Sequence, residues 1–222
     1  MNKIAFLIIF ILAMVMAASA GDPSQLKPPK GFKVALVEFV DLQCPDCANA
    51  APVLEDARHT YKIPLVRYDF PLQKHNWARQ AAILARFFDT KSRKIGDEFR
   101  DYCFQHQPGR EQPNITTPNE LRQHAEMFAA QRKIPLPLVV DPDGKLEAEV
   151  NQDVALGNSV GIVHTPTIYV VSNKATGQPF VEVVDRNNLF QQIDEMIAAA
   201  GGASGGPHET NPKKSRAAKT VR

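Results

Sequence analysis

The sequence predicts an α/β domain in which a mixed β-sheet carries an inserted block of helices. Short apolar runs rich in β-branched and aromatic residues occur near both ends of the chain, where they alternate with helical segments. Between them lies a long stretch with helical periodicity and no strand signal. The chain has 222 residues, 44% hydrophobic and 23% charged, which is enough for one well-buried domain with an insertion.

The first half of the sheet is predicted from the N-terminal third of the chain. Residues 34–40, "VALVEFV", form an apolar run typical of a strand buried on both faces. A helix follows over residues 45–62, with Pro45 in its first turn and Pro52 at a position that should kink it. Residues 63–70 are the next strand. Because a β-α-β unit is right-handed, we expect the two strands to be parallel.

The inserted block, at about residues 74–160, contains four predicted helices. They cover residues 75–90, 92–107, 117–133 and 144–162. The third opens with Thr117, Pro118 and Glu120, a capping box with proline at the first helical position. We expect this block to form a helical cap beside the sheet.

The chain then returns to the sheet. Residues 166–173 and 179–185 are predicted strands, joined in a hairpin by a turn at Thr176-Gly177. Residues 187–200 form a closing amphipathic helix. Its apolar positions at helical spacing are Leu189, Ile193, Met196 and Ile197. The first and last pieces can therefore share one mixed sheet, in a domain over residues 33–200 that follows a short lead at residues 21–32.

The two ends of the chain differ from this body. Residues 1–20 combine Lys3, an apolar run and the ending Ala18-Ser19-Ala20, which is typical of a signal peptide cleaved before Gly21; an uncleaved anchor is the alternative. Residues 201–222 form a tail with five basic residues and one acidic residue, and its composition predicts disorder. The body lacks a basic face interleaved with aromatic residues, which argues against nucleic-acid binding.

Cys44 and Cys47 stand at the predicted start of the first helix. Unpaired N–H groups and the helix dipole stabilise an anion there, so the first sulfur should be reactive, with the second one turn away. Redox exchange, a metal site and a static disulfide are three interpretations. Structural zinc needs four ligands and only Cys103 remains, while a disulfide across so short a loop constrains the unfolded chain little. The pattern favours redox exchange.

Glu38 is an acidic residue inside the apolar strand at residues 34–40. Burial would raise the pKa of its carboxyl toward neutrality, which would suit proton exchange with Cys47. The alternative is that Glu38 lies near a strand edge and faces water.

Three features of the sequence together resemble the thioredoxin superfamily. They are the segment "EFVDLQCPDC", Pro52 five residues after the second cysteine, and the segment "GIVHTPTIYV". The helical block between the two halves of the sheet is similar to that of the DsbA-like branch, and the resemblance covers residues 33–200. It implies a thioredoxin-like fold and a thiol-disulfide oxidoreductase that needs no organic cofactor and no metal.

The resemblance also implies roles for individual residues. Cys44 matches the attacking thiol and Cys47 the resolving thiol, while Glu38 matches a buried acid that relays the proton of the resolving thiol. Pro166 matches a proline that follows a cis peptide bond and faces the cysteines, so the backbone of Thr165 should bind a substrate peptide. Substrates would be exported proteins with thiols or disulfides, in the periplasm or another extracytoplasmic space, and a membrane partner would recycle the pair.

The active-site loop departs from the DsbA pattern, which has histidine before the second cysteine. Here the dipeptide is Pro45-Asp46, and an acidic Asp46 should oppose the Cys44 thiolate, making this protein a weaker oxidant than DsbA. His164, next to the loop, is a candidate to assist the thiolate or is simply a loop residue. The catalytic residues are the same in both directions, so the sequence does not fix the direction of exchange. A peptide-binding, chaperone-like module with a static disulfide and a metal-binding protein remain as alternatives.

Other residues have simpler interpretations. We expect Cys103 to be a buried apolar residue, and His75 to be a helix-start or packing residue. Trp77, Phe87 and Phe88 should belong to the core of the cap. Asn114-Ile115-Thr116 fits a glycosylation acceptor, which matters only in a glycosylating secretory pathway.

Overall fold

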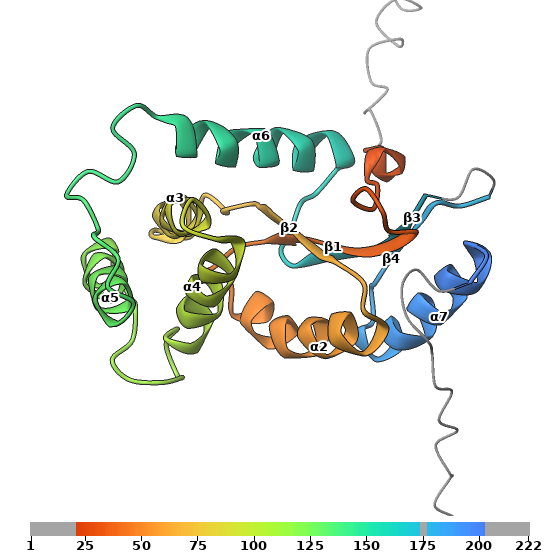
Figure 1. Cartoon of the computed structure of the whole chain (residues 1–222), viewed down its shortest axis with the longest axis horizontal. Coiled ribbons are helices and arrows are strands. Elements are labelled where there is room, and N and C mark those ends of the chain that lie inside the picture. The colour runs from red at the N-terminus through yellow and green to blue at the C-terminus, as the bar shows by residue number, and fades with distance from the viewer. Residues whose placement is uncertain (1–20, 174–176, 203–222) are drawn as a thin grey trace, which may run out of the picture.

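The computed structural model describes residues 21–173 and 177–202 (Figure 1). A four-stranded mixed sheet lies at its centre, in the order β2-β1-β3-β4. The strands are β1 (Val34–Val40), β2 (Leu65–Asp69), β3 (Thr167–Ser172) and β4 (Phe180–Glu182). β1 is parallel to β2 and antiparallel to β3, and β4 is antiparallel to β3. The predicted mixed sheet is confirmed, with the first and last pieces of the chain paired at its middle.

Both faces of the sheet are covered, which explains why β1 is apolar at nearly every position. Helices α2 (Pro45–Tyr61) and α7 (Leu189–Ala199) lie on one face, and α6 (Lys145–Val160) lies on the other (Figure 1). Side chains alternate between the faces of a strand. Val34 and Leu36 accordingly pack in the cluster that contains α2 and α7, whereas the intervening residues of β1 pack under α6.

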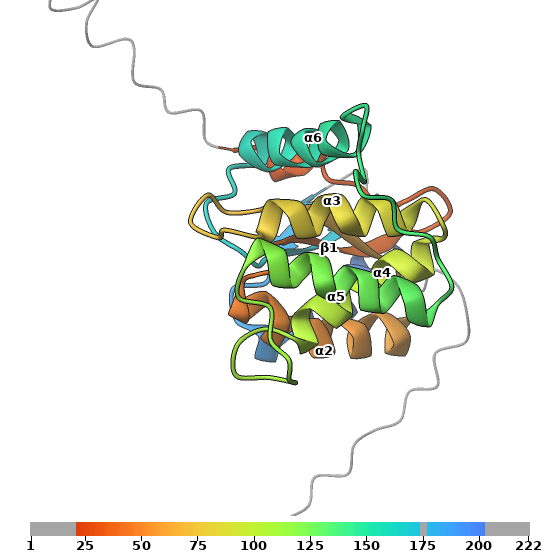
Figure 2. The same ribbon diagram turned by 90° about the vertical axis from the view of Figure 1, so that its left-hand side faces the viewer.

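Three helices form the cap: α3 (Ala78–Asp89), α4 (Arg93–Gln105) and α5 (Pro118–Gln131). Figure 2 shows them side by side at one end of the sheet. The fourth predicted helix, α6, belongs to the insertion in sequence but covers a sheet face. No helix in the described part of the chain is long and apolar enough to span a bilayer.

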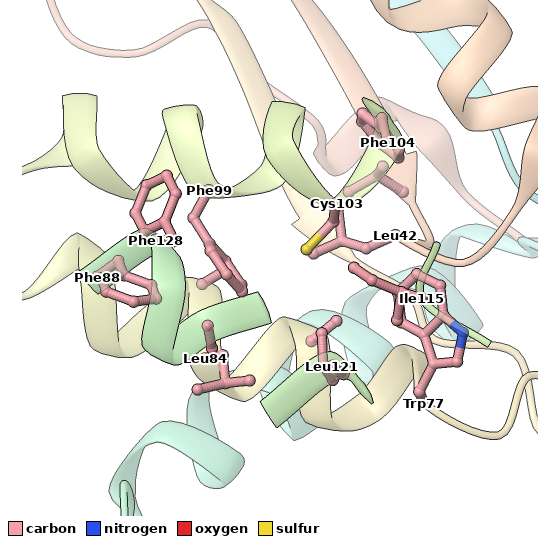
Figure 3. Packing of buried hydrophobic residues seen from close by; sticks show 14 of the residues in the cluster. Leu42, Trp77, Leu84, Phe88, Phe99, Cys103, Phe104, Ile115, Leu121 and Phe128 are labelled. Atoms are coloured by element: carbon pink, nitrogen blue, oxygen red, sulfur yellow. The ribbon is translucent and has the colours of Figure 1, made fainter. Parts of the chain in front are cut away.

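The cap has its own apolar core (Figure 3), and the same cluster contains Cys44 and Cys47. The predicted core residues Trp77, Phe87 and Phe88 are buried there. Cys103 is fully buried, and its sulfur points into this core, as predicted for a small apolar residue. Phe88, Phe99 and Phe128 pack against one another in tilted and edge-to-face contacts, with ring centroids 4.6–5.1 Å apart.

Element boundaries follow the local signals closely in most places. The capping box at α5 is confirmed, because the Thr117 hydroxyl accepts from the Glu120 N–H and the Glu120 carboxylate accepts from the Thr117 N–H. α2 runs through Pro52 as one helix. The last strand ends early, at Glu182, since Asp185 caps a short 3-10 helix, η2 (Arg186–Asn188).

Some predictions fall outside the described residues. The predicted signal peptide at residues 1–20 and most of the predicted tail at residues 201–222 lie there, as does Thr176 of the predicted hairpin turn. A second short 3-10 helix, η1 (Pro23–Gln25), begins the described chain, and Leu26 after it is buried with α6.

Candidate active site

The two cysteines lie where β1 passes into α2. A tight turn after β1 is closed by a hydrogen bond from the Cys44 N–H to the Asp41 carbonyl, 3.0 Å. Cys44 is the N-cap of α2, Pro45 is at its first position, and Cys47 lies in the first turn. Both cysteines are buried and both are free thiols. The helix therefore directs its unpaired N–H groups toward the first sulfur, as the sequence predicted.

The two thiols differ strongly in acidity. A hydrogen bond from Cys47 lowers the pKa of Cys44 to about 5, with further help from the backbone N–H groups of Cys47 and Asp46 and against the cost of burial. Burial raises the pKa of Cys47 well above its ordinary value, and the negative charge of Glu38 adds to this effect. One sulfur can thus be an anion near neutral pH while its partner stays protonated.

The loop before β3 faces the first sulfur. The Cys44 thiol donates to the carbonyl of Thr165, 3.2 Å away, and the Thr165-Pro166 peptide bond is cis, as the resemblance implied. His164 is exposed, and its hydrogen bonds go to Thr167. These contacts bring Thr165 and Pro166 to the cysteines but leave the suggested help from His164 a prediction.

Glu38 is fully buried at the centre of the sheet, so the alternative of a water-facing position at a strand edge is wrong. Burial raises the pKa of its carboxyl, and the neighbouring Arg67 opposes that rise. One carboxylate oxygen accepts from Arg67 Nε at 3.1 Å, and the other has no hydrogen-bond partner. Arg67 also contacts Glu55 at 3.1 Å and Asp97 at 3.7 Å. Glu38 and Arg67 are 29 residues apart, and no local pattern matches Glu38 with this arginine.

Comparison with known families identifies the architecture. A thioredoxin family model matches residues 32–193, well over half of the chain. The chain belongs to the thioredoxin family. No curated protein sequence matches it.

Several solved structures share this thioredoxin-family fold. The thiol-disulfide exchange protein alpha-DsbA2 from Wolbachia pipientis has a TM-score of 0.58 at 19% identity, over 77% of this chain and 85% of that one. Pseudomonas aeruginosa DsbA2 has a TM-score of 0.55 at 21% identity, over 79% and 91%. A periplasmic thioredoxin-like protein from Salmonella enterica serovar Typhimurium has 0.58 at 19%, over 76% and 87%. These likenesses confirm the predicted DsbA-like fold.

In this thioredoxin-family chain, Asp46 does not face the thiolate as an unpaired charge. Arg186 of η2 donates two hydrogen bonds to its carboxylate, at 3.0 and 2.8 Å, and this contact lowers the pKa of Asp46. The expectation that Asp46 opposes the Cys44 thiolate is therefore corrected, because Arg186 offsets the negative charge of Asp46. Arg186 is 140 residues away in sequence, and nothing in its local pattern points to the site.

Two further side chains hold the loop of this thioredoxin-family site. Gln107, buried two residues after the end of α4, donates from Nε2 to the carbonyls of Leu42 and Cys44 at 2.8 and 3.2 Å. His75 precedes α3 instead of starting it, and its Nδ1 lies 2.7 Å from the Asp41 carboxylate. Of the two predicted roles of His75, the helix-start role is therefore wrong, and the side chain is partly buried against Asp41. No three His, Cys, Asp or Glu side chains within residues 21–173 and 177–202 are grouped to hold a metal.

Proposed function

We propose that this chain is an exported thiol-disulfide oxidoreductase that uses the pair Cys44 and Cys47 to form, reduce or isomerise disulfides. The observation that carries the proposal is the contrast between the two thiols. The pKa of Cys44 falls to about 5, whereas burial raises the pKa of Cys47. A nucleophile that is already an anion, beside a protonated resolving thiol, is what disulfide exchange requires.

In the oxidative direction the pair starts as a disulfide. A substrate thiolate attacks the sulfur of Cys44, the bond to Cys47 breaks, and its electron pair leaves on Cys47, which then takes up a proton. The substrate is now joined to Cys44. A second substrate thiolate attacks the substrate sulfur of this mixed disulfide, and Cys44 leaves as a thiolate. The substrate has lost two electrons and the protein pair has gained them.

In the reductive direction the same atoms act in reverse. The Cys44 thiolate attacks a substrate disulfide, one substrate sulfur leaves with the electron pair, and Cys47 then attacks Cys44 to release the product. Glu38 is assigned the proton of Cys47, because its buried carboxyl has a raised pKa and its charge acts on that thiol.

The backbone beside Pro166 is assigned to substrate binding. The Thr165 carbonyl is 3.2 Å from the Cys44 sulfur, so a peptide joined to that sulfur would lie alongside it. Substrates would be exported proteins that carry thiols or disulfides, and a membrane partner would restore the redox state of the pair. Export rests on the signal-like segment at residues 1–20.

The test is a redox equilibrium of residues 21–222 in graded glutathione buffers. Alkylation and mass spectrometry would read Cys44 and Cys47 separately from Cys103. We expect a single two-electron couple: a potential near about −120 to −180 mV would indicate an oxidase or isomerase, and one near about −270 mV a reductase.

Other outcomes would overturn the proposal. Failure of Cys44 and Cys47 to pair excludes exchange. Full activity after Cys44→Ser would indicate a binding module with a static disulfide. Stoichiometric zinc on the reduced protein, with loss of structure on chelation, would indicate a metal-binding protein.

A further inference from the structure

Asp41 carries a fully buried carboxylate that the chemistry above does not use. It lies directly after β1, one residue past the end of the strand. One oxygen accepts from the Gln43 N–H at 2.7 Å, and the other accepts from the Leu72 N–H at 2.8 Å and lies 2.7 Å from His75 Nδ1. These three contacts come from two different loops, so they fix the Asp41 side chain firmly.

The backbone of the same residue contacts both cysteines. Its carbonyl accepts from the Cys44 N–H at 3.0 Å, and its N–H donates to the Cys47 sulfur at 3.5 Å. Cys47 is otherwise in poor surroundings for an anion, because it is fully buried and near the charge of Glu38. The Asp41 N–H is therefore well placed to stabilise charge on the second sulfur.

We propose that the Asp41 side chain acts as a positioning group that holds its own backbone N–H as a hydrogen-bond donor to the Cys47 thiolate. The inference rests on the proposed function, since that thiolate forms when the disulfide between Cys44 and Cys47 breaks. A substrate thiolate then bonds to Cys44, and the electron pair of the broken bond goes to Cys47. The charge on Cys47 arises before any proton reaches it, and the donor is already in place.

The sign of the shift in the pKa of Cys47 separates the proposal from a simple charge effect. Asp41 is itself negative, so removing its charge should, through space alone, make the Cys47 thiolate easier to form. If the side chain works by holding the N–H, removing it should make the thiolate harder to form. The two explanations predict opposite shifts in the pKa of Cys47.

The experiment measures the pH dependence of Cys47 alkylation in a Cys44→Ala background, with mass spectrometry to separate Cys47 from Cys103. Asp41→Asn keeps the size of the side chain but loses the carboxylate that accepts from both loops. We expect the thiolate fraction of Cys47 at a fixed pH to fall by roughly tenfold, the loss of one charge-assisted hydrogen bond.

Two variants serve as controls. Gln43→Ala breaks contacts between the same loops, to Asn76 and the Trp77 N–H, but keeps the Asp41 carboxylate; we expect no shift. Glu38→Gln removes a charge near Cys47 that does not position the Asp41 N–H, and we expect the thiolate fraction of Cys47 to rise. A fall for Asp41→Asn beside a rise for Glu38→Gln supports the proposal. A rise for both, or equal falls for Asp41→Asn and Gln43→Ala, overturns it.

His75→Ala covers the case in which Asp41→Asn does not fold. It removes the contact between the partly exposed His75 side chain and the Asp41 carboxylate, and we expect a smaller fall in the thiolate fraction of Cys47. An unchanged Cys47 overturns the proposal. Because this assay follows the ionisation of Cys47 alone and needs no disulfide exchange, it gives an answer whether or not the glutathione equilibrium of the parent protein supports exchange. A failure of the proposed function and a failure of this inference are thus told apart.

Discussion

Cys44 owes its acidity to neighbours that exist only in the folded protein. An ordinary thiol ionises near 9.0, whereas hydrogen bonds from Cys47 and the start of α2 lower the pKa of Cys44 to about 5. The lowered pKa makes the free energy of unfolding depend on pH, because the folded state favours the anion more than the unfolded state does. The disulfide form has no such group at this position.

The first consequence is a pH dependence that separates the two redox forms. A lowered folded pKa contributes stability that is fully present above the unfolded pKa and is lost as the pH falls through the folded value. We therefore expect the reduced form to gain stability relative to the oxidised form as the pH rises from about 5 to about 9, the window between the two pKa values. Groups that titrate in both forms cancel.

Denaturant unfolding of the two forms at several pH values measures this difference. Cys44→Ser in the reduced state is the control and should remove the dependence. A constant difference across the window would contradict a lowered pKa for Cys44.

At the scale of elements, the contact between η2 and α2 decides how Asp46 affects the site. Arg186 forms a two-bonded pair with Asp46, but both side chains are partly exposed, so the pair should add little to stability. The pair instead affects the Cys44 thiolate, because Arg186 offsets the negative charge of Asp46 next to it. The paired charge leaves the Asp46 N–H free to support Cys44 without an opposing carboxylate.

We expect Arg186→Gln to raise the pKa of Cys44 and to leave the unfolding free energy within about 1 kcal/mol of the parent. Adding Asp46→Asn to Arg186→Gln should reverse the rise in the pKa of Cys44, because no unpaired carboxylate remains. The pH dependence of Cys44 alkylation in both single variants and the double variant checks this. A rise that persists in the double variant would show that Arg186 acts without Asp46.

Most elements could be predicted from local signals, whereas the start of α3 is set by contacts between residues distant in sequence. The strand at residues 34–40 and the capping box of α5 depend on neighbours in sequence, and both are found as predicted. α3 begins at Ala78 rather than at His75 because other loops take the preceding groups. His75 binds Asp41, and the Trp77 N–H donates to the Gln43 side chain at 2.8 Å.

At the scale of the whole molecule, one buried side chain joins the cap to the site. Gln107 reaches from the loop directly after α4 to the loop that carries Cys44, where it donates to the carbonyl of Leu42. Its own backbone carbonyl accepts from Asn114 at 3.0 Å, so the loop after α4 is tied to the same point.

We expect Gln107→Ala to lower the unfolding free energy by about 1–3 kcal/mol, because the Leu42 carbonyl loses its partner in a buried site. Gln105→Ala, at the exposed last position of α4 and two residues before Gln107, should be nearly neutral. Denaturant titration of the two variants compares them directly. Equal effects would mean that the connection to the loop carries no stability.

The same scale separates what the sequence could predict about the site from what it could not. Cys44, Cys47 and Glu38 belong to one local motif, and Pro166 belongs to a second, so the sequence indicated all four. Arg67, Arg186 and Gln107 reach the site only through tertiary contacts, and polar side chains of this kind occur at many surface positions. Their partners depend on how the insertion and the last strands return to β1.

The packing of these later segments against β1 also determines when in folding the site is assembled. The contact between Cys44 and the Thr165 carbonyl spans 121 residues, and the contact between Asp46 and Arg186 spans 140. Such distant contacts form late, because the loop between them must first be closed, and N-terminal segments are synthesised and exposed first. A chain that has folded only through α2 would hold two cysteines beside an unpaired acid. The contacts of the Cys44 loop with Thr165 and Arg186 therefore complete the site only when the rest of the fold is in place, whereas the hydrogen bonds from Cys47 and the start of α2 that lower the pKa of Cys44 are local.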